Sequence, residues 1–320
     1  MVATGKALLI ARREVRLLSR SRATQGALVL LVSVAWLPAI LLPLRRGSLG
    51  VASFTELLPL QIALGAVILP LLALLAGAEL FAGELEDGSL IPALTLSISR
   101  RACFVGKCLG RAATLGAAYL VAFASAGLAV AATHGGTGWR DWAVVTASGL
   151  LVSFSSGGVG AALGAAGSGR VRAFGAALVT WIILVFALDA LLLTIVVALA
   201  PPPPGSIGEH GHGEVAAPRA PPTEMPIHQG VEPVDPHARH AEPEGPKSSR
   251  LSGGLMALNP VSLFRVTSLA ASPGLRLRLA LALPGGTGAG LGTTIVAGWL
   301  IWLVAPLAVG LRRFVRADLT

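Results

Sequence analysis

The chain has 320 residues, of which 54% are hydrophobic and 13% are charged, and its formal net charge at pH 7 is +9. A soluble domain carries about 25% charged residues, so this composition excludes an ordinary soluble domain and predicts an all-α integral membrane protein. The positive charge does not indicate nucleic-acid binding, because the arginines stand at the ends of apolar runs and form no basic face with interleaved aromatic residues.

Residues 1–24 predict an amphipathic helix on the cytoplasmic face. Leucine, isoleucine and valine alternate there with arginine at helical spacing, which is typical of a helix that lies flat in the membrane interface. A cleaved signal peptide is the alternative. The basic region is too long for one, and no small-residue cleavage site follows the first apolar run.

Six apolar segments are long enough to cross a bilayer core, which takes about 20 helical residues. They lie near residues 25–44, 57–81, 106–133, 141–165, 173–199 and 288–311. The first five fill residues 25–199, and the sixth belongs to a C-terminal part, 288–320, that ends in a short tail.

The positions of lysine and arginine predict the orientation of these spans. Fifteen of them fall in the connections on one side, against three (Arg45, Arg46 and Arg140) in the short connections on the other. By the positive-inside rule, both termini are predicted to be cytoplasmic, which requires an even number of spans.

Between the second and third spans, residues 82–105 form a connection that we call the charged link. Its charged and turn residues are Glu84, Glu86, Asp87, Gly88, Ser89, Arg100 and Arg101. We expect the acids at the start of a short helix and the arginines at its end, because each then complements the helix dipole. A solvated loop that obeys the positive-inside rule is the alternative, and it explains the arginines but not the acids.

Residues 200–250 are rich in proline, glycine and charge, and they predict a disordered periplasmic insert. Within residues 251–287, the stretch "LMALNPVSLFRVTSLAA" becomes apolar again but is too short and too polar to span, so we expect helices resting on the outer membrane face. Five histidines of the insert are spaced so that they could bind copper or zinc, and incidental histidines in a plain linker are the alternative. They are His210, His212, His228, His237 and His240.

Four stretches together resemble the type-2 ABC-transporter permease family, and within it the permeases of nitrous-oxide reductase maturation systems. They are "IARREVRLLSRSR" (10–22), "ILPLLALLAGAELFAGELEDGSL" (68–90) with "SISRRACFVGK" (97–107), "SGRVRAFGAALVTWIILVFALD" (168–189) and "LNPVSLFRV" (258–266). Ser97 stands where this family usually has proline, and the histidine-rich insert has no counterpart in it.

The resemblance implies a homodimeric exporter subunit in a bacterial inner membrane, whose charged link acts as the coupling helix for two separate ATP-binding cassette subunits. ATP and magnesium would bind to those partners, because "GKAL" and "GKCL" lack the other residues of a P-loop. The chain itself is therefore predicted to be no enzyme and to bind no cofactor directly.

A periplasmic, NosD-like accessory protein is the further expected partner besides membrane lipid. The implied role is assembly of the copper–sulfur centre of nitrous-oxide reductase. The alternatives are a related permease that exports a lipid, a peptide or a drug, and a metal-binding membrane scaffold.

Two acids within the spans are candidate functional residues. Asp189 falls in the fifth span, where a charge costs about 2.5–3.5 kcal/mol, so it either lines the transport path or is a neutral carboxyl bonded to a neighbouring helix. Glu79 either anchors the end of the second span or contacts the substrate. Gly160 and Gly164 predict close helix packing in the fourth span, within the chain or in a dimer.

Overall fold

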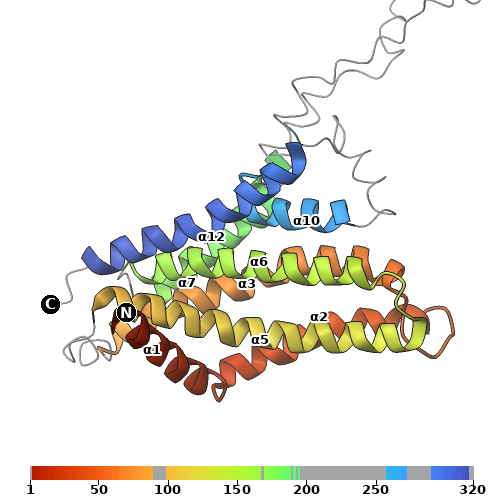
Figure 1. The fold of residues 1–320 in the computed structure, drawn as a ribbon, viewed down its shortest axis with the longest axis horizontal. Coiled ribbons are helices and arrows are strands. Elements are labelled where there is room, and N and C mark those ends of the chain that lie inside the picture. The colour runs from red at the N-terminus through yellow and green to blue at the C-terminus, as the bar shows by residue number, and fades with distance from the viewer. Residues whose placement is uncertain are drawn as a thin grey trace, which may run out of the picture.

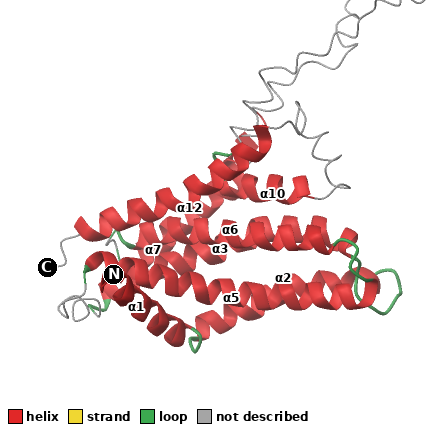
Figure 2. Cartoon of the chain, viewed as in Figure 1, coloured by secondary structure: helices red, strands yellow, loops and turns green. Residues whose placement is uncertain are grey.

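The computed structural model describes residues 2–88, 99–166, 169–188, 190, 191, 194, 257–271 and 290–316. Throughout this described part the regular elements are helices, joined by short loops, and there is no strand (Figure 2). The all-α prediction is therefore confirmed for the residues described.

The helices lengthen several of the predicted segments. In chain order they are α1 (Val2–Leu18), α2 (Arg22–Leu44), α3 (Phe54–Glu86), α5 (Arg100–His134), α6 (Trp139–Gly164), α7 (Arg170–Ile182), the π-helix η1 (Ile183–Ala187), α10 (Pro260–Ala271) and α12 (Gly290–Arg316). Within the part of the chain that the structure describes, six helices are long and apolar enough to cross a membrane: α2, α3, α5, α6, α7 continued by η1, and α12. This confirms the prediction of six spans.

The centre of the bundle is a close contact between α3 and α6, made possible by glycine. A Cβ atom on Gly160 would stand 2.2 Å from the carbonyl oxygen of Leu74, and one on Gly164 would stand 2.3 Å from that of Ala78. Any larger residue would push the two backbones apart. The predicted packing role of this glycine pair is confirmed, and its partner is α3 of the same chain.

A proline leaves a backbone carbonyl of α2 without its usual helical hydrogen bond, and a side chain of α3 supplies one. Pro38 has no N–H to donate to the carbonyl of Val34, four residues earlier. The fully buried side chain of Gln61 donates from Nε2 to the carbonyl oxygens of Val34 and Ala35, at 3.0 Å each. The proline-containing helix is thereby joined to the core helix.

One end of the bundle collects α1, the last turns of α3 and α12, and the first turns of α5 and α7 (Figure 1). We call it the charged end. Three phenylalanines hold its helices together: the rings of Phe81 and Phe104 stack with centroids 4.9 Å apart, and Phe314 lies 4.9 Å from the first and 5.7 Å from the second. This places the end of α12 against α3 and α5.

The short helix α10 packs into the bundle, against α6, α12 and α3. Its Leu263 and Phe264 are buried, and they lie against Gly298 and Gly65, where a Cβ atom would come within 2.9 Å and 3.2 Å of them. The predicted outer-face segment is therefore anchored by a helix with buried contacts. Its position relative to the membrane surface stays a prediction.

Candidate functional site at the charged end

A buried lysine joins three helices at the charged end. The side chain of Lys107, in the second turn of α5, is only 6% exposed. Its Nζ lies 2.6 Å from Oε1 of Glu14 in α1 and 2.5 Å from Oε1 of Glu84 in α3. A charge this deeply buried must be paired, so the lysine and its two carboxylates form one unit whose members depend on each other.

The lysine can reach α1 because glycine brings α1 and α5 together. A Cβ atom on Gly106 would stand 2.7 Å from the carbonyl oxygen of Ala7, and one on Gly110 would stand 2.5 Å from Cβ of Glu14. Ala7 and Ala11 form the buried side of α1. The N-terminal helix is therefore bound tightly to the third span. Whether its other side lies in the membrane interface stays a prediction.

An arginine makes the second junction, between α3 and α7. The backbone N–H of Arg170, the first residue of α7, donates to Oε2 of Glu86 at 2.7 Å, so the carboxylate caps the positive end of that helix. The side chain of Arg170 passes over Gly83 and donates from Nη2 to Oε1 of Glu79 at 3.1 Å. Glu79 thus ties the end of the second span to the fifth span, and its role as an anchor or in substrate contact stays a prediction.

The acids of the charged link lie at the end of the second span, and whether the predicted helix begins after them lies outside the described residues. Glu84 and Glu86 lie in the last turn of α3, Asp87 is its C-cap, and Gly88 follows with a φ of +66°. No proline stands between the predicted end of the span at residue 81 and Gly88, which takes the left-handed conformation that ends many helices. Carboxylates at the C-terminal end of a helix interact unfavourably with the helix dipole. Lys107 compensates for this at Glu84, and the backbone N–H at the start of α7 does so at Glu86.

The arginines differ from the prediction. Ser99 caps α5 by accepting from the backbone N–H of Ala102, so Arg100 and Arg101 are the first residues of α5, at the end where cations are disfavoured. Arg100 Nη1 donates to the carbonyl oxygen of Val315 at 3.0 Å, in the last turn of α12. The cation therefore does meet a helix C-terminus, but that of α12. Ser89 and the helix expected between the acids and the arginines lie outside the described residues.

The sequence analysis missed the residues that complete these junctions. Lys107, Glu14 and Arg170 were not singled out there as site residues. One signal was available for Glu14, since it is the only acid in the arginine-rich N-terminal helix. Its partner is 93 positions away in the chain, and spacing alone cannot identify such a contact.

A second feature lies where the fifth span approaches Asp189. There the helix widens into η1, and Asn259, just before α10, donates from Nδ2 to the carbonyl oxygen of Leu184 in η1 at 2.7 Å. Asn259 Oδ1 also accepts from the backbone N–H of Val261 at 3.0 Å. A fully buried amide thus joins η1 to the start of α10. Asp189 itself lies outside the described residues.

The five histidines of the insert likewise lie outside the described residues. Among the residues that are described, no group of three or more His, Cys, Asp and Glu side chains is placed to hold a metal ion. The metal prediction therefore depends on the insert alone.

The bundle of six apolar helices with ion-paired charges at one end defines a multi-pass membrane protein, and the family follows from comparison. The sequence profile of the family described as "ABC-2 family transporter protein" matches residues 8–319. The chain therefore belongs to the ABC-2 transporter family, whose members are transporter subunits.

Two curated relatives bear the name probable ABC transporter permease protein NosY. The one from Stutzerimonas stutzeri is 33% identical over 175 residues, which are 53% of this chain and 61% of the relative. The one from Pseudomonas aeruginosa is 30% identical over 173 residues, which are 53% of this chain and 62% of the relative. Both matches span less than two thirds of the relatives' length. The resemblance to NosY permeases that the sequence motifs indicated is confirmed.

Proposed function

We propose that this chain is the membrane subunit of an ABC exporter, which works as a homodimer with two ATP-binding cassette subunits. ATP and magnesium bind to those subunits, and the chain carries no ATPase chemistry of its own. The charged end lies on the cytoplasmic side of a bacterial inner membrane and receives the ATP-binding subunits. The observation that carries the proposal is that both ends of the charged link are bonded to other helices of the bundle.

The contacts explain how a force on the charged link would reach the spans. Its acidic end is bonded to α1 and α5 through Lys107 and to α7 through Arg170, while its basic end is bonded to α12 through Arg100. A partner subunit that pushed on the link would therefore move four other helices together with α3. Asp87 is exposed, and no hydrogen bond or ion pair of its side chain to the described residues occurs, so it is free to contact a partner. We assign Gly88, Ser89 and Arg101 to the same docking surface.

We further propose that the exported species serves assembly of the copper–sulfur centre of nitrous-oxide reductase, as the likeness to NosY permeases implies. A periplasmic, NosD-like protein would receive it on the far side of the membrane. The histidine-rich insert would act there as a weak collector of copper. Its synthetic peptide should then bind copper in a histidine-dependent manner, and a peptide that binds none would make the insert a plain linker.

Asp189 is proposed to act in the transport path. The bond from Asn259 to η1 supports this, because it fixes the backbone just before this acid, and π-turns are frequent at functional sites. Asp189→Asn keeps the shape and hydrogen bonding but removes the ionisable proton. Transport should fall while assembly persists. Full transport by the Asn variant would assign the residue a structural role.

The proposed role is tested in a strain that makes nitrous-oxide reductase but lacks this chain. Reductase from that strain should lack the visible absorption of its copper–sulfur centre, and the wild-type chain should restore it. The variant Glu86→Lys with Asp87→Lys should reach the membrane in normal amounts and restore little. A matched control is Arg12→Gln with Arg13→Gln, which changes two exposed charges of α1 at the same end. A complete copper centre without this chain would overturn the assigned role, and full activity of the Lys variant would overturn the coupling role.

A further inference from the structure

An apolar cleft of about 710 Å³ opens between α5, α6 and α12, with α3 also contributing to its lining. Its volume falls within the range of about 300–1,000 Å³ that is typical of ligand sites. Leu109 of α5 and Leu307 of α12 line it. Leu109 is 51% exposed and Leu307 is 36% exposed, so the cleft is open at the side of the bundle. A bundle within a membrane presents such a side opening to lipid.

One cation lies in this cleft. Among the described residues that line it, Arg111 is the single charged side chain. Its Nε atom is buried and donates to no acceptor within the described part of the chain. Burial of an unpaired donor is costly, so the site would be stabilised by an occupant that carries acceptor oxygens.

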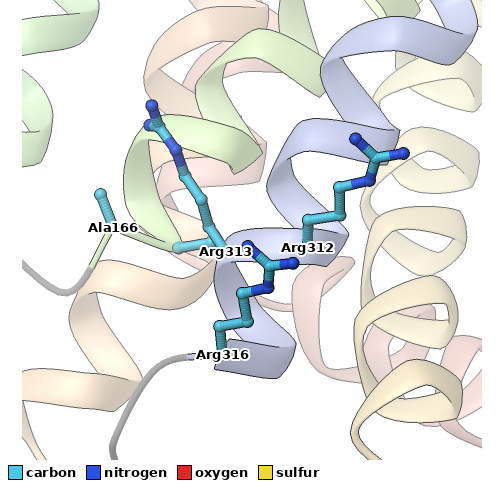
Figure 3. A pocket seen from close by; sticks show the side chains of 5 residues that line it. Ala166, Arg312, Arg313 and Arg316 are labelled. Atoms are coloured by element: carbon cyan, nitrogen blue, oxygen red, sulfur yellow. The ribbon is translucent and has the colours of Figure 1, made fainter.

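A cluster of three more cations adjoins the cleft. Arg312, Arg313 and Arg316, at the end of α12, line a second hollow of about 390 Å³ with Ala165 and Ala166 (Figure 3). Their guanidinium groups fan out from the last turns of α12, and none of them is paired with a carboxylate of the described residues.

The hollow and the cleft lie next to each other along two helices. On α12, Leu311 lines the cleft and the next residue, Arg312, lines the hollow. On α6, Ala161 lines the cleft and Ala165, one turn further on, lines the hollow. A basic hollow therefore adjoins an apolar cleft that has an arginine in its lining.

We propose that this is a binding site for an anionic phospholipid of the membrane leaflet at the charged end. The headgroup phosphate binds the three arginines of α12, one acyl chain fills the cleft, and Arg111 donates to the ester oxygens between them. Basic pockets between spanning helices at the membrane surface are suited to such headgroups. A small soluble anion would leave the cleft unfilled, and a second copy of this surface would bring like charges together.

A bound lipid would reinforce contacts already present at this end. The last turn of α12 is held by the bond from Arg100 and by the packing of Phe314. A lipid that joins the arginines of α12 to α5 and α6 would fix the same turn from the other side. This site depends on the membrane location of the chain and not on the proposed export role.

The site is tested by measuring which lipids the detergent-purified chain retains, with native mass spectrometry and lipid extraction. We expect phosphatidylglycerol or cardiolipin to be enriched over phosphatidylethanolamine. Arg312→Gln with Arg313→Gln and Arg316→Gln should lower the retained anionic lipid about tenfold or more. Ala112→Phe, which fills the cleft from α5, should lower the retention of the same lipid. The matched control, Arg12→Gln with Arg13→Gln and Arg16→Gln, removes three exposed charges of α1 and should retain lipid as the wild type does.

Thermal melting gives a second measurement that works for any variant that folds. Added phosphatidylglycerol should raise the melting temperature of the wild type and of the α1 control, but not that of the α12 variant. Phosphatidylcholine and inorganic phosphate should have no such effect. Equal retention of anionic lipid by the α12 variant and the wild type would overturn the proposal. An equal rise in melting temperature with inorganic phosphate would also overturn it. So would an α12 variant that loses its ATP-binding partner while its retained lipid is unchanged, because the arginines would then belong to the contact with that partner.

Discussion

Lys107 shows how one residue organises the charged end. Two carboxylates from different helices share its ammonium group, and its side chain is almost completely enclosed. The sequence could predict that this end is rich in charge, because the charges of the link stand between two apolar runs. It could not predict the pairing, since Glu14 and Lys107 are brought together only by the approach of α1 to Gly106 and Gly110.

Replacing this lysine should therefore be far more damaging than replacing an exposed cation. Lys107→Met leaves Glu14 and Glu84 close together without the ammonium group that bonds to both, and we expect a loss of about 3–5 kcal/mol in the free energy of unfolding. The measurement is the thermal or denaturant stability of the purified chain. Arg12→Gln, an exposed charge on α1, is the control and should change stability by less than about 0.5 kcal/mol.

The origin of the loss can be tested by neutralising the acids as well. Lys107→Met combined with Glu14→Gln and Glu84→Gln no longer buries unpaired charge, so it should be more stable than Lys107→Met alone. A triple variant that is less stable than the single variant would show that the lysine acts mainly through packing.

Asn259 is the second residue whose role only the structure identifies. The Leu–Asn–Pro stretch was recognisable as a motif, but not the bond from its amide to the widened turn of the fifth span. Asn259→Leu should leave the carbonyl of Leu184 and the N–H of Val261 without these partners, at about 1–3 kcal/mol for each. The measurement is thermal stability. A Leu variant as stable as the wild type would contradict this.

Among the helices, α3 and α6 show what an apolar pattern can and cannot predict. The small residues of the fourth span indicated close packing, and that prediction is confirmed. The identity of the partner depended on tertiary structure, because Gly77 of α3 and Gly160 of α6 each face the other helix's backbone. The ends of α3 and α5 were placed wrongly for a related reason. Contacts with α7 and α12 offset the unfavourable helix-dipole terms at their termini.

The glycine contact offers a matched pair of variants on one helix. Gly160→Ala would place a methyl group 2.2 Å from the carbonyl oxygen of Leu74, so α3 and α6 must separate, at about 1–3 kcal/mol or more. Gly157→Ala meets nothing closer than the carbonyl of Ala73 at 3.7 Å and should be tolerated. Melting temperatures of the two purified variants make the comparison. Equal values would mean that α3 and α6 are not held as closely as the structure places them.

On the scale of the whole molecule, composition and the spacing of apolar runs were sufficient to predict six spans. Each span is a continuous run of the length that a bilayer requires, and no long-range contact is needed to recognise it. The structure adds that α1 and the end of α12 lie at the same end of the bundle (Figure 1). Which side of the membrane that end faces is a prediction from the fifteen-to-three distribution of lysine and arginine.

This orientation predicts opposite locations for two reporters. A reporter fused after Thr320 should be cytoplasmic, and one inserted within residues 205–245 should be periplasmic, because the positive-inside rule places the basic connections in the cytoplasm. Activity of a phosphatase that works only in the periplasm distinguishes the two. Both reporters on one side would contradict the six-span topology.

The central claim is that the charged link couples this permease to a separate ATP-binding subunit. The most direct test is ATP hydrolysis by the purified complex of the two, compared between the wild type and Asp87→Lys. Asp87 is the suitable position because its side chain is exposed and makes no hydrogen bond or ion pair with the described residues. We predict that the chain co-purifies with the ATP-binding subunit and changes its rate of hydrolysis, and that Asp87→Lys weakens the association or abolishes this effect while its melting temperature is unchanged. An ATP-binding subunit that neither binds the chain nor responds to it, or an Asp87→Lys complex with wild-type coupling, would contradict the account.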